Sequence, residues 1–91
     1  MRLDKFLKVS RLIKRRTVAK EMCDQGRVLV NQKVAKASTE IRVGDELALQ
    51  FGHRLLRVRV ERLSENPKKE EVAQLYTLLE DRRLETVPEE G

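Results

Sequence analysis

The apolar positions at the start of the chain repeat at helical spacing. At about 100° per residue, three large side chains fall on one side of a short first helix, and these are Leu3, Phe6 and Leu7. A second helical stripe follows after a bend and contains Val18, Ala19, Met22 and Cys23. Thr17 is the expected N-cap of this second helix, and Gly26 can end it in the left-handed conformation. The pattern therefore predicts two short helices that turn their apolar faces towards one core.

Alternating apolar positions then predict a small antiparallel sheet. Val28 and Val30 share one face of a short strand over 28–31, and a tight turn at 31–33 leads back into Val34. Gln32 stands where such a turn usually has Gly, because the position needs a positive φ. Two longer strands follow a turn at 43–45 and are joined by a hairpin at Gly52 and His53. Their inward residues are Leu47, Leu49 and Phe51 in one, and Leu56, Val58 and Val60 in the other.

The last apolar pattern predicts a carboxy-terminal helix over Pro67–Arg82. Val72, Leu75, Tyr76 and Leu79 recur at i, i+3, i+4 and i+7, with Asn66 as the expected cap and Pro67 at the first helical position. We expect this stripe to pack on the core; the alternative is a protein-interaction module in which the stripe binds a partner. The expected organisation is an α+β fold with one domain over 1–64, the helix within 65–84, and a flexible acidic tail over 85–91.

Charge is distributed unevenly along the 91 residues. The first 36 residues hold 11 Lys or Arg against 3 Asp or Glu, whereas the whole chain has a formal net charge of +5. Lys14, Arg15 and Arg16 crowd into the bend between the first two helices, where like charges repel unless an anion neutralises them. Arg57 and Arg59, on the outer face of a strand, are expected to be solvated or to pair across strands. A basic surface this dense on a small fold indicates a polyphosphate partner.

The residue inventory disfavours an enzyme. His53 is the only histidine and lies in an expected turn, and Cys23 is the only cysteine and lies on an apolar stripe. One Cys and one His cannot build a zinc site or a disulfide, and no Gly-rich phosphate motif is present, so we expect neither metal nor cofactor. The single cysteine and the absence of an apolar run of about 18 residues suggest a cytoplasmic protein that does not enter a membrane.

The basic positions of the two helices and the bend are the candidate nucleic-acid contacts. They are Arg2, Lys5, Lys8, Arg11, Lys14, Arg15, Arg16 and Lys20. Aromatic residues make up only 3% of the chain, which favours recognition of RNA shape and phosphates over stacking on unpaired bases. Duplex DNA is disfavoured because the second helix devotes its length to apolar residues rather than to side chains that reach base edges.

The segment RLDKFLKVSRLIKRRTVAKEMCDQGRVLVN, followed by KVAK, resembles the RNA-binding domain first described in the fourth protein of the small ribosomal subunit, the S-four (S4) domain or αL motif. The resemblance carries the basic residues above into the motif, Arg2 and Arg16 foremost, and adds Asn31 and Lys33 at the turn. Asp4 also falls inside the motif, where we expect it to form a salt bridge with a neighbouring Arg or Lys.

Within that family, the opening RLDKFLKVSRLIKRRT and the late KKEEVAQLYTLLED are similar to small stand-alone bacterial factors of ribosome-associated quality control. This resemblance implies a monomer that binds large-subunit ribosomal RNA and peptidyl-tRNA on a stalled, free large subunit. It also implies action beside the tailing factor RqcH during alanine tailing of the nascent chain. A related heat-shock protein that acts on dissociated large subunits is the alternative within RNA binding.

Overall fold

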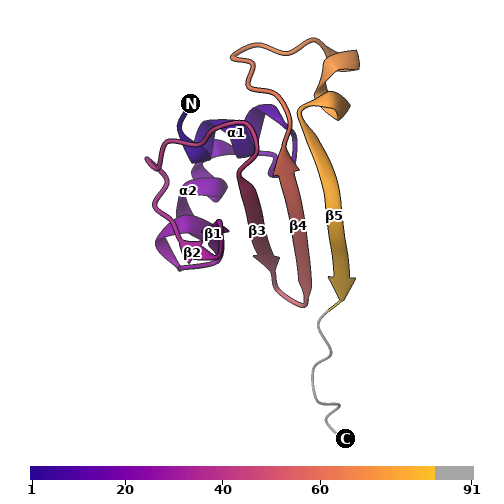
Figure 1. The fold of residues 1–91 in the computed structure, drawn as a ribbon. Helices are drawn as coiled ribbons and strands as arrows, with labels where there is room; N and C mark the ends of the chain where they lie inside the picture. Colours follow the sequence, from indigo (N-terminus) through magenta and orange to yellow (C-terminus); the bar gives the residue numbers. More distant parts are fainter. Residues whose placement is uncertain (84–91) are drawn as a thin grey trace, which may run out of the picture.

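The computed structural model describes residues 1–83, which form two helices, a five-stranded antiparallel sheet and one 3-10 helix. In chain order the elements are α1 (Leu3–Val9), α2 (Arg16–Asp24), β1 (Val28–Val30), β2 (Lys33–Val34), β3 (Glu46–Phe51), β4 (Arg54–Val60), η1 (Lys69–Gln74) and β5 (Tyr76–Arg83). The strand order is β2-β1-β3-β4-β5. Both helices lie beside the β1–β3 part of the sheet, and β5 forms the far edge (Figure 1). The expected α+β class is confirmed.

The core lies between the two helices and one face of the sheet. Leu3, Phe6 and Leu7 of α1 are fully buried, as the helical spacing predicts. The sheet contributes Val28, Leu47, Leu49, Val58 and Val60, each with no exposed surface. Burying a large aliphatic side chain stabilises the fold by about 1.5–3 kcal/mol, so these residues fix how the helices sit on the sheet.

Two details of the second helix differ from expectation. It begins at Arg16 with Arg15 in the cap position and no side-chain capping bond, so the prediction that Thr17 caps it was wrong. Val18 is 40% exposed rather than inward, while Ala19, Met22 and Cys23 are buried. Arg15 has an extended backbone, with φ of −123° and ψ of 138°, and takes the cap position, so the helix begins two residues earlier than a Thr17 cap would place it.

The basic bend between α1 and α2 is anchored from inside. Ile13 is buried, and its backbone N–H donates to the carbonyl of Leu7 at 3.0 Å. The buried hydroxyl of Ser10 also donates to Leu7, at 3.2 Å. Arg11 takes a left-handed conformation with φ of 64°, which is costly for a residue with a Cβ. These contacts hold the backbone of the bend in place while its cationic side chains remain outside.

The predicted carboxy-terminal helix is absent, and this expectation was wrong. Residues Lys69–Gln74 form a 3-10 helix, and Tyr76–Arg83 form strand β5, which pairs antiparallel with β4. A strand satisfies the backbone groups along the open side of β4, and Tyr and Thr at its start favour extended structure. Leu75 is 1% exposed and therefore belongs to the core. The segment predicted to hold the helix extended to residue 84, and a flexible acidic tail was predicted over 85–91. Both residue 84 and this tail lie outside the described residues.

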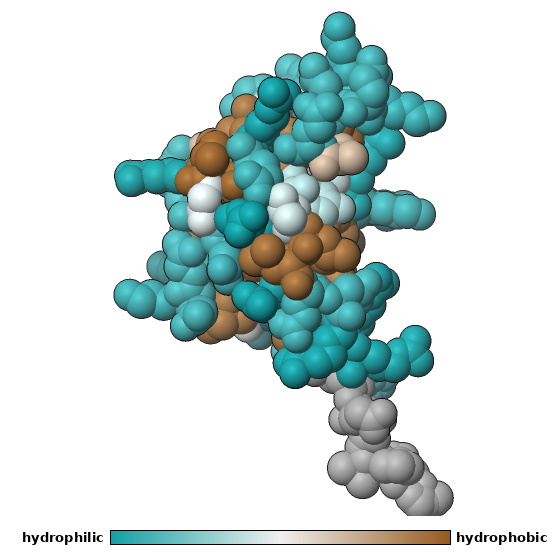
Figure 2. Space-filling model, turned by 45° about the vertical axis from the view of Figure 1, so that its right-hand side comes forward, coloured by the Kyte–Doolittle hydropathy of each residue, from teal (hydrophilic) through white to brown (hydrophobic). Residues whose placement is uncertain are grey.

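Cross-strand ion pairs cover the sheet face that the helices leave open. Arg57 donates to Glu46 on β3 and to Glu80 on β5, both at 2.9 Å, as its expected cross-strand role requires. Arg59 pairs with Glu61, two residues further along the chain, at 3.1 Å, so this ion pair does not cross between strands. The space-filling view shows hydrophobic side chains in separate patches bordered by hydrophilic ones (Figure 2). Among the described residues, no helix is long and apolar enough to cross a membrane.

Candidate RNA interface

The predicted contact residues come from four parts of the fold. Arg2 precedes α1, Lys5 and Lys8 lie on it, and the bend supplies Arg11, Lys14 and Arg15; α2 supplies Arg16 and Lys20, and the β1–β2 turn supplies Asn31 and Lys33. All ten except Lys5 are exposed, and Lys5 is half-buried. The fold therefore presents the cations of residues 2–20 on the surface of one helix pair.

Arg2 and Arg16 meet at the carboxylate of Asp4. The Nε of Arg2 lies 3.2 Å from Asp4 Oδ1, and the Nε of Arg16 lies 3.3 Å from Asp4 Oδ2. The Asp4 side chain is 5% exposed, whereas the two arginine side chains are 49% and 47% exposed. The expected salt bridge of Asp4 is confirmed. We call this group the Arg2–Asp4–Arg16 cluster; it joins the start of α1 to the start of α2.

The cluster keeps Asp4 ionised. Burial raises the pKa of Asp4. The hydrogen bonds and positive charges of Arg16 and Arg2 together lower the pKa by more than burial raises it, so the pKa lies below its ordinary value of 3.8. At neutral pH one negative charge therefore lies under two positive ones. The backbone before α1 is fixed as well, because Leu3 N–H donates to the carbonyl of Thr39 at 2.8 Å and Arg2 bridges to Glu40.

Lys5 and Asn31 are engaged within the fold. Lys5 pairs with Glu65, and the hydrogen bond from Lys5 lowers the pKa of that carboxyl group. The Asn31 side chain donates to Asp45 at 3.1 Å and accepts from the Glu46 N–H at 3.0 Å. Asn31 and Gln32 have φ of 51° and 72°, so the turn forms as expected although neither residue is Gly. These bonds use one of the three N–H donors of Lys5 and one of the two N–H donors of Asn31, so each side chain keeps donors for a further contact.

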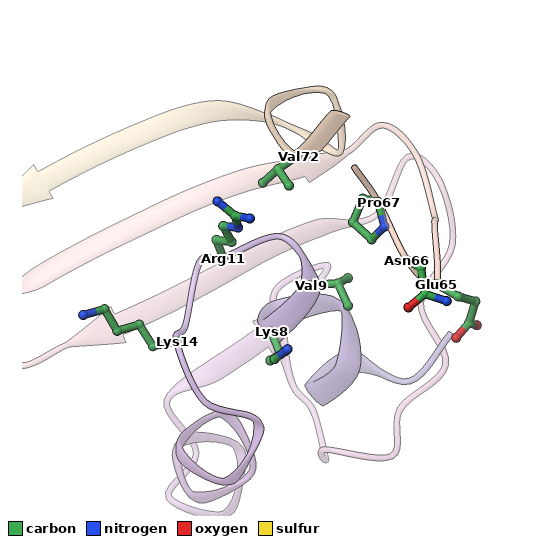
Figure 3. Close-up of a pocket in the computed structure, with 8 residues that line it drawn as sticks. All are labelled: Lys8, Val9, Arg11, Lys14, Glu65, Asn66, Pro67 and Val72. Atoms are coloured by element: carbon green, nitrogen blue, oxygen red, sulfur yellow. The ribbon is translucent and has the colours of Figure 1, made fainter. Parts of the chain in front are cut away.

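Two open hollows flank the helix pair. One, of about 520 Å³, lies beside α2 and is lined by Arg2 and Lys20 together with Lys36. The other, of about 510 Å³, lies between the basic bend and residues 65–72, and contains Lys8, Arg11 and Lys14 (Figure 3). Sequence reasoning did not include Lys36, which ends the KVAK motif and lines the first hollow, among the candidate contacts. It assigned Asn66 of the second hollow only to helix capping.

Neither residue considered for catalysis is among the candidate contacts, although Cys23 helps to line the hollow beside α2. Cys23 is buried, and burial raises its pKa to about 11, with the charges of Asp4 and Asp24 adding to the effect. The thiol is therefore protonated at neutral pH, and a thiol is a poor nucleophile. His53 is exposed in the β3–β4 turn. Within residues 1–83, no three His, Cys, Asp or Glu side chains gather in a way that could hold a metal ion.

Known proteins are similar to this chain in both sequence and fold. The S4 domain matches residues 1–47. The "RQC P-site tRNA stabilizing factor" of Bacillus subtilis is 57% identical over 84 residues, which cover 92% of this chain and 98% of that protein. The "Heat shock protein 15 homolog" of Haemophilus influenzae is 36% identical over 75 residues, covering 82% of this chain and 57% of that protein.

Among solved structures, the trimeric Vibrio cholerae heat shock protein 15 superimposes with a TM-score of 0.80 at 32% identity, covering 87% of this chain and 81% of that one. The named relatives are described by tRNA stabilisation or heat shock rather than by an enzymatic reaction. The resemblance to the S4 family is confirmed by the S4 match. It is also confirmed by the 57% identity to the Bacillus protein, which extends over nearly the whole of both chains. The chain belongs to the S4 domain family and, within it, to the RQC P-site tRNA stabilizing factors (RqcP).

Proposed function

We propose that this chain is a cytoplasmic, non-enzymatic factor that stabilises the P-site tRNA during ribosome-associated quality control. In this proposal it binds ribosomal RNA and peptidyl-tRNA on a stalled, free large subunit. It thereby supports alanine tailing of the nascent chain by RqcH. Family membership supports the tRNA role, and the exposed cations of residues 2–20 support binding to RNA phosphates.

The observation that carries the proposal is the Arg2–Asp4–Arg16 cluster. A guanidinium group can bind phosphate with two parallel N–H donors, provided that its plane is held in the right orientation. Asp4 supplies that orientation for both arginines from below, at 3.2 and 3.3 Å, while about half of each arginine side chain stays exposed. Two guanidinium groups, one just before α1 and one at the start of α2, are therefore fixed relative to each other before RNA arrives, which reduces the entropy cost of binding.

The heat-shock type of S4 protein, which acts on dissociated large subunits, is the second candidate. The TM-score of 0.80 to the Vibrio cholerae protein favours it at the level of the fold. Coverage favours the quality-control role, because this chain spans 98% of the Bacillus factor but only 57% of the Haemophilus heat shock protein 15 homolog. The protein-interaction alternative required an exposed carboxy-terminal helix, and that helix is absent.

The test is co-sedimentation with purified small subunits, large subunits and large subunits that carry peptidyl-tRNA, at two salt concentrations. We expect binding to large subunits, strongest when peptidyl-tRNA is present, and a loss of about 1–3 kcal/mol for each phosphate contact removed in Arg2→Ala/Arg16→Ala. Arg54→Ala/Arg59→Ala is the matched control, since it removes the same charge from β4, away from the helix pair.

Alanine tailing provides a second readout. In a reaction that contains RqcH and stalled large subunits, the Arg2→Ala/Arg16→Ala variant is expected to shorten the tails and the control variant to leave them unchanged. Preferential binding to large subunits without peptidyl-tRNA, with tailing unaffected, would favour the heat-shock type. Equal, weak binding to all particles by all variants would contradict both roles and leave a general polyanion binder.

A further inference from the structure

The hollow beside the basic bend has two unlike walls. One wall carries Lys8, Arg11 and Lys14 from the end of α1 and the bend, and the other carries Asn66, Pro67 and Val72 from the segment before β5 (Figure 3). Its volume of about 510 Å³ lies within the range of about 300–1,000 Å³ that is usual for small-ligand sites. The S4 match ends at residue 47, so the second wall is built by the part of the chain beyond it.

The second wall is held firmly in place. The carbonyl of Leu75, a buried residue, accepts backbone hydrogen bonds from Glu61 at 2.8 Å and Arg62 at 3.2 Å. The backbone N–H of Lys68 donates to the Glu71 carboxylate at 3.0 Å, which closes the first turn of η1. The ion pair between Lys5 and Glu65 ties the segment to α1. The hollow is therefore a feature of the folded chain and does not depend on a bound partner.

The charges of the two walls differ. Lys8, Arg11 and Lys14 are exposed and form no ion pair within residues 1–83. On the opposite wall, the only carboxylate is Glu65, which Lys5 already neutralises. What remains there is a proline ring, a valine side chain and an amide. A matching ligand must combine an anion with a flat, weakly polar group that has a hydrogen-bonding edge.

We propose that this hollow binds one unpaired nucleotide that protrudes from an RNA helix. Lys8 and Lys14 neutralise its phosphates, and the base lies between the Arg11 guanidinium and the Pro67 ring. Stacking on a guanidinium plane replaces the aromatic stacking for which this chain has few residues. The Asn66 amide can donate to and accept from the base edge, and adenine offers the matching donor and acceptor. The inference deepens the proposed function and rests on it, because it takes the partner to be RNA.

An acidic peptide fits the hollow less well. Its carboxylates would pair with Lys8, Arg11 and Lys14. Its backbone, however, would offer no planar group to pack against the apolar side chains of Pro67 and Val72. In the proposed function the helix pair contacts the RNA, so a protruding nucleotide would reach the hollow from an RNA that is already bound. The Arg2–Asp4–Arg16 cluster and the hollow thus make separate predictions, one for affinity and one for the preference among RNAs.

The experiment compares three RNA hairpins of the same sequence by fluorescence anisotropy with the full chain. One is fully paired, one has a single bulged adenosine, and one has an abasic bulge. Because stacking of a base on a planar side chain strengthens binding, we expect the wild type to bind the bulged adenosine about tenfold more tightly than either other hairpin. Asn66→Ala and Arg11→Ala should reduce this ratio towards one, and Gln50→Ala, an exposed residue on the sheet, should keep it. Thermal melting confirms that each variant is folded.

The outcomes separate this inference from the proposed function. Arg2→Ala/Arg16→Ala should weaken binding to all three hairpins while keeping the ratio. Equal affinity for the three hairpins, or equal affinity for the adenosine and abasic bulges, would overturn the nucleotide site and leave the RNA-binding role intact. Displacement of the bulged hairpin by a Glu-rich peptide, but not by adenosine monophosphate at the same concentration, would also overturn it and assign the hollow to an acidic peptide.

Discussion

Replacing Asp4 by Asn tests whether the buried carboxylate positions the two arginines above it. The change keeps the size of the side chain and removes its charge. Asp4 makes four contacts of 3.2–3.4 Å with Arg2 and Arg16. Hydrogen bonds to a charged group are worth about 1.5–3 kcal/mol, but both arginines are half exposed, so solvent screening reduces this to about 1 kcal/mol for each arginine. We therefore expect Asp4→Asn to lower the free energy of unfolding by about 2 kcal/mol.

The pH dependence of that loss identifies its cause. Because the pKa of Asp4 is lowered in the folded protein, its contribution to stability is fully present above the ordinary value of 3.8 and is lost as the pH falls through the folded-state pKa. Urea denaturation at neutral pH should show the full difference between wild type and Asp4→Asn. Below pH 3.8 the difference should shrink progressively. Asp81→Asn, which breaks the exposed pair with Arg54, is the control and should cost much less.

RNA binding makes the sharper test, because charge and positioning predict opposite signs. Asp4→Asn raises the net charge by one, which alone would strengthen binding to RNA at low salt. If Asp4 instead orients Arg2 and Arg16, the affinity should fall although the protein has become more positive. Tighter binding by Asp4→Asn, with the salt dependence increased and stability unchanged, would refute the positioning role.

Three further predictions concern the fold. Leu75→Asp should unfold the protein or cost several kcal/mol, since a charge would replace a side chain that is 1% exposed; circular dichroism that stays native would show that this side chain is not part of the core. Gln32→Gly should raise the free energy of unfolding by about 0.5–1 kcal/mol in thermal melts, because Gln32 has φ of 72° and Gly adopts a positive φ with less steric strain. A lower melting temperature would count against strain at this turn. Light scattering should give the monomer mass of 10.6 kDa, because the bulge and charged side chains of β5 blunt the sheet edge; a trimer, as in the Vibrio cholerae neighbour, would contradict this.

The features that the sequence predicts correctly are those set by neighbouring residues. The α1 stripe follows from helical spacing alone, and Gly26 has the left-handed φ of 75° that its place after α2 requires. The bend also follows locally, since Ile13 is buried between cations that must stay outside. The turn at Asn31 and Gln32 formed without Gly because the Asn31 side chain bonds to Asp45 and Glu46 across the sheet, a contact that spacing alone does not reveal.

The missing helix shows how a distant strand overrides a local pattern. Val72, Leu75, Tyr76 and Leu79 have helical spacing, yet only Leu75 of the four is fully buried. As a strand, the same segment satisfies the open backbone edge of β4 and places Glu80 opposite Arg57 and Asp81 within 2.7 Å of Arg54. In a helix these carboxylates would have only local partners. The sheet therefore gains both backbone hydrogen bonds and ion pairs that the helix could not supply.

The same reasoning explains why the candidate interface was predicted only in part. The cations of residues 2–20 are close in sequence, so their clustering was visible from spacing. Lys5 pairs with a residue 60 positions away, and the hollow facing Lys8 and Arg11 exists only because the segment that leads into β5 returns to the helix pair. Had residues 67–82 formed the expected helix, Asn66 would have capped it. Because they form η1 and β5 instead, Asn66 lines the hollow, and the misread element and the unforeseen hollow have one physical cause.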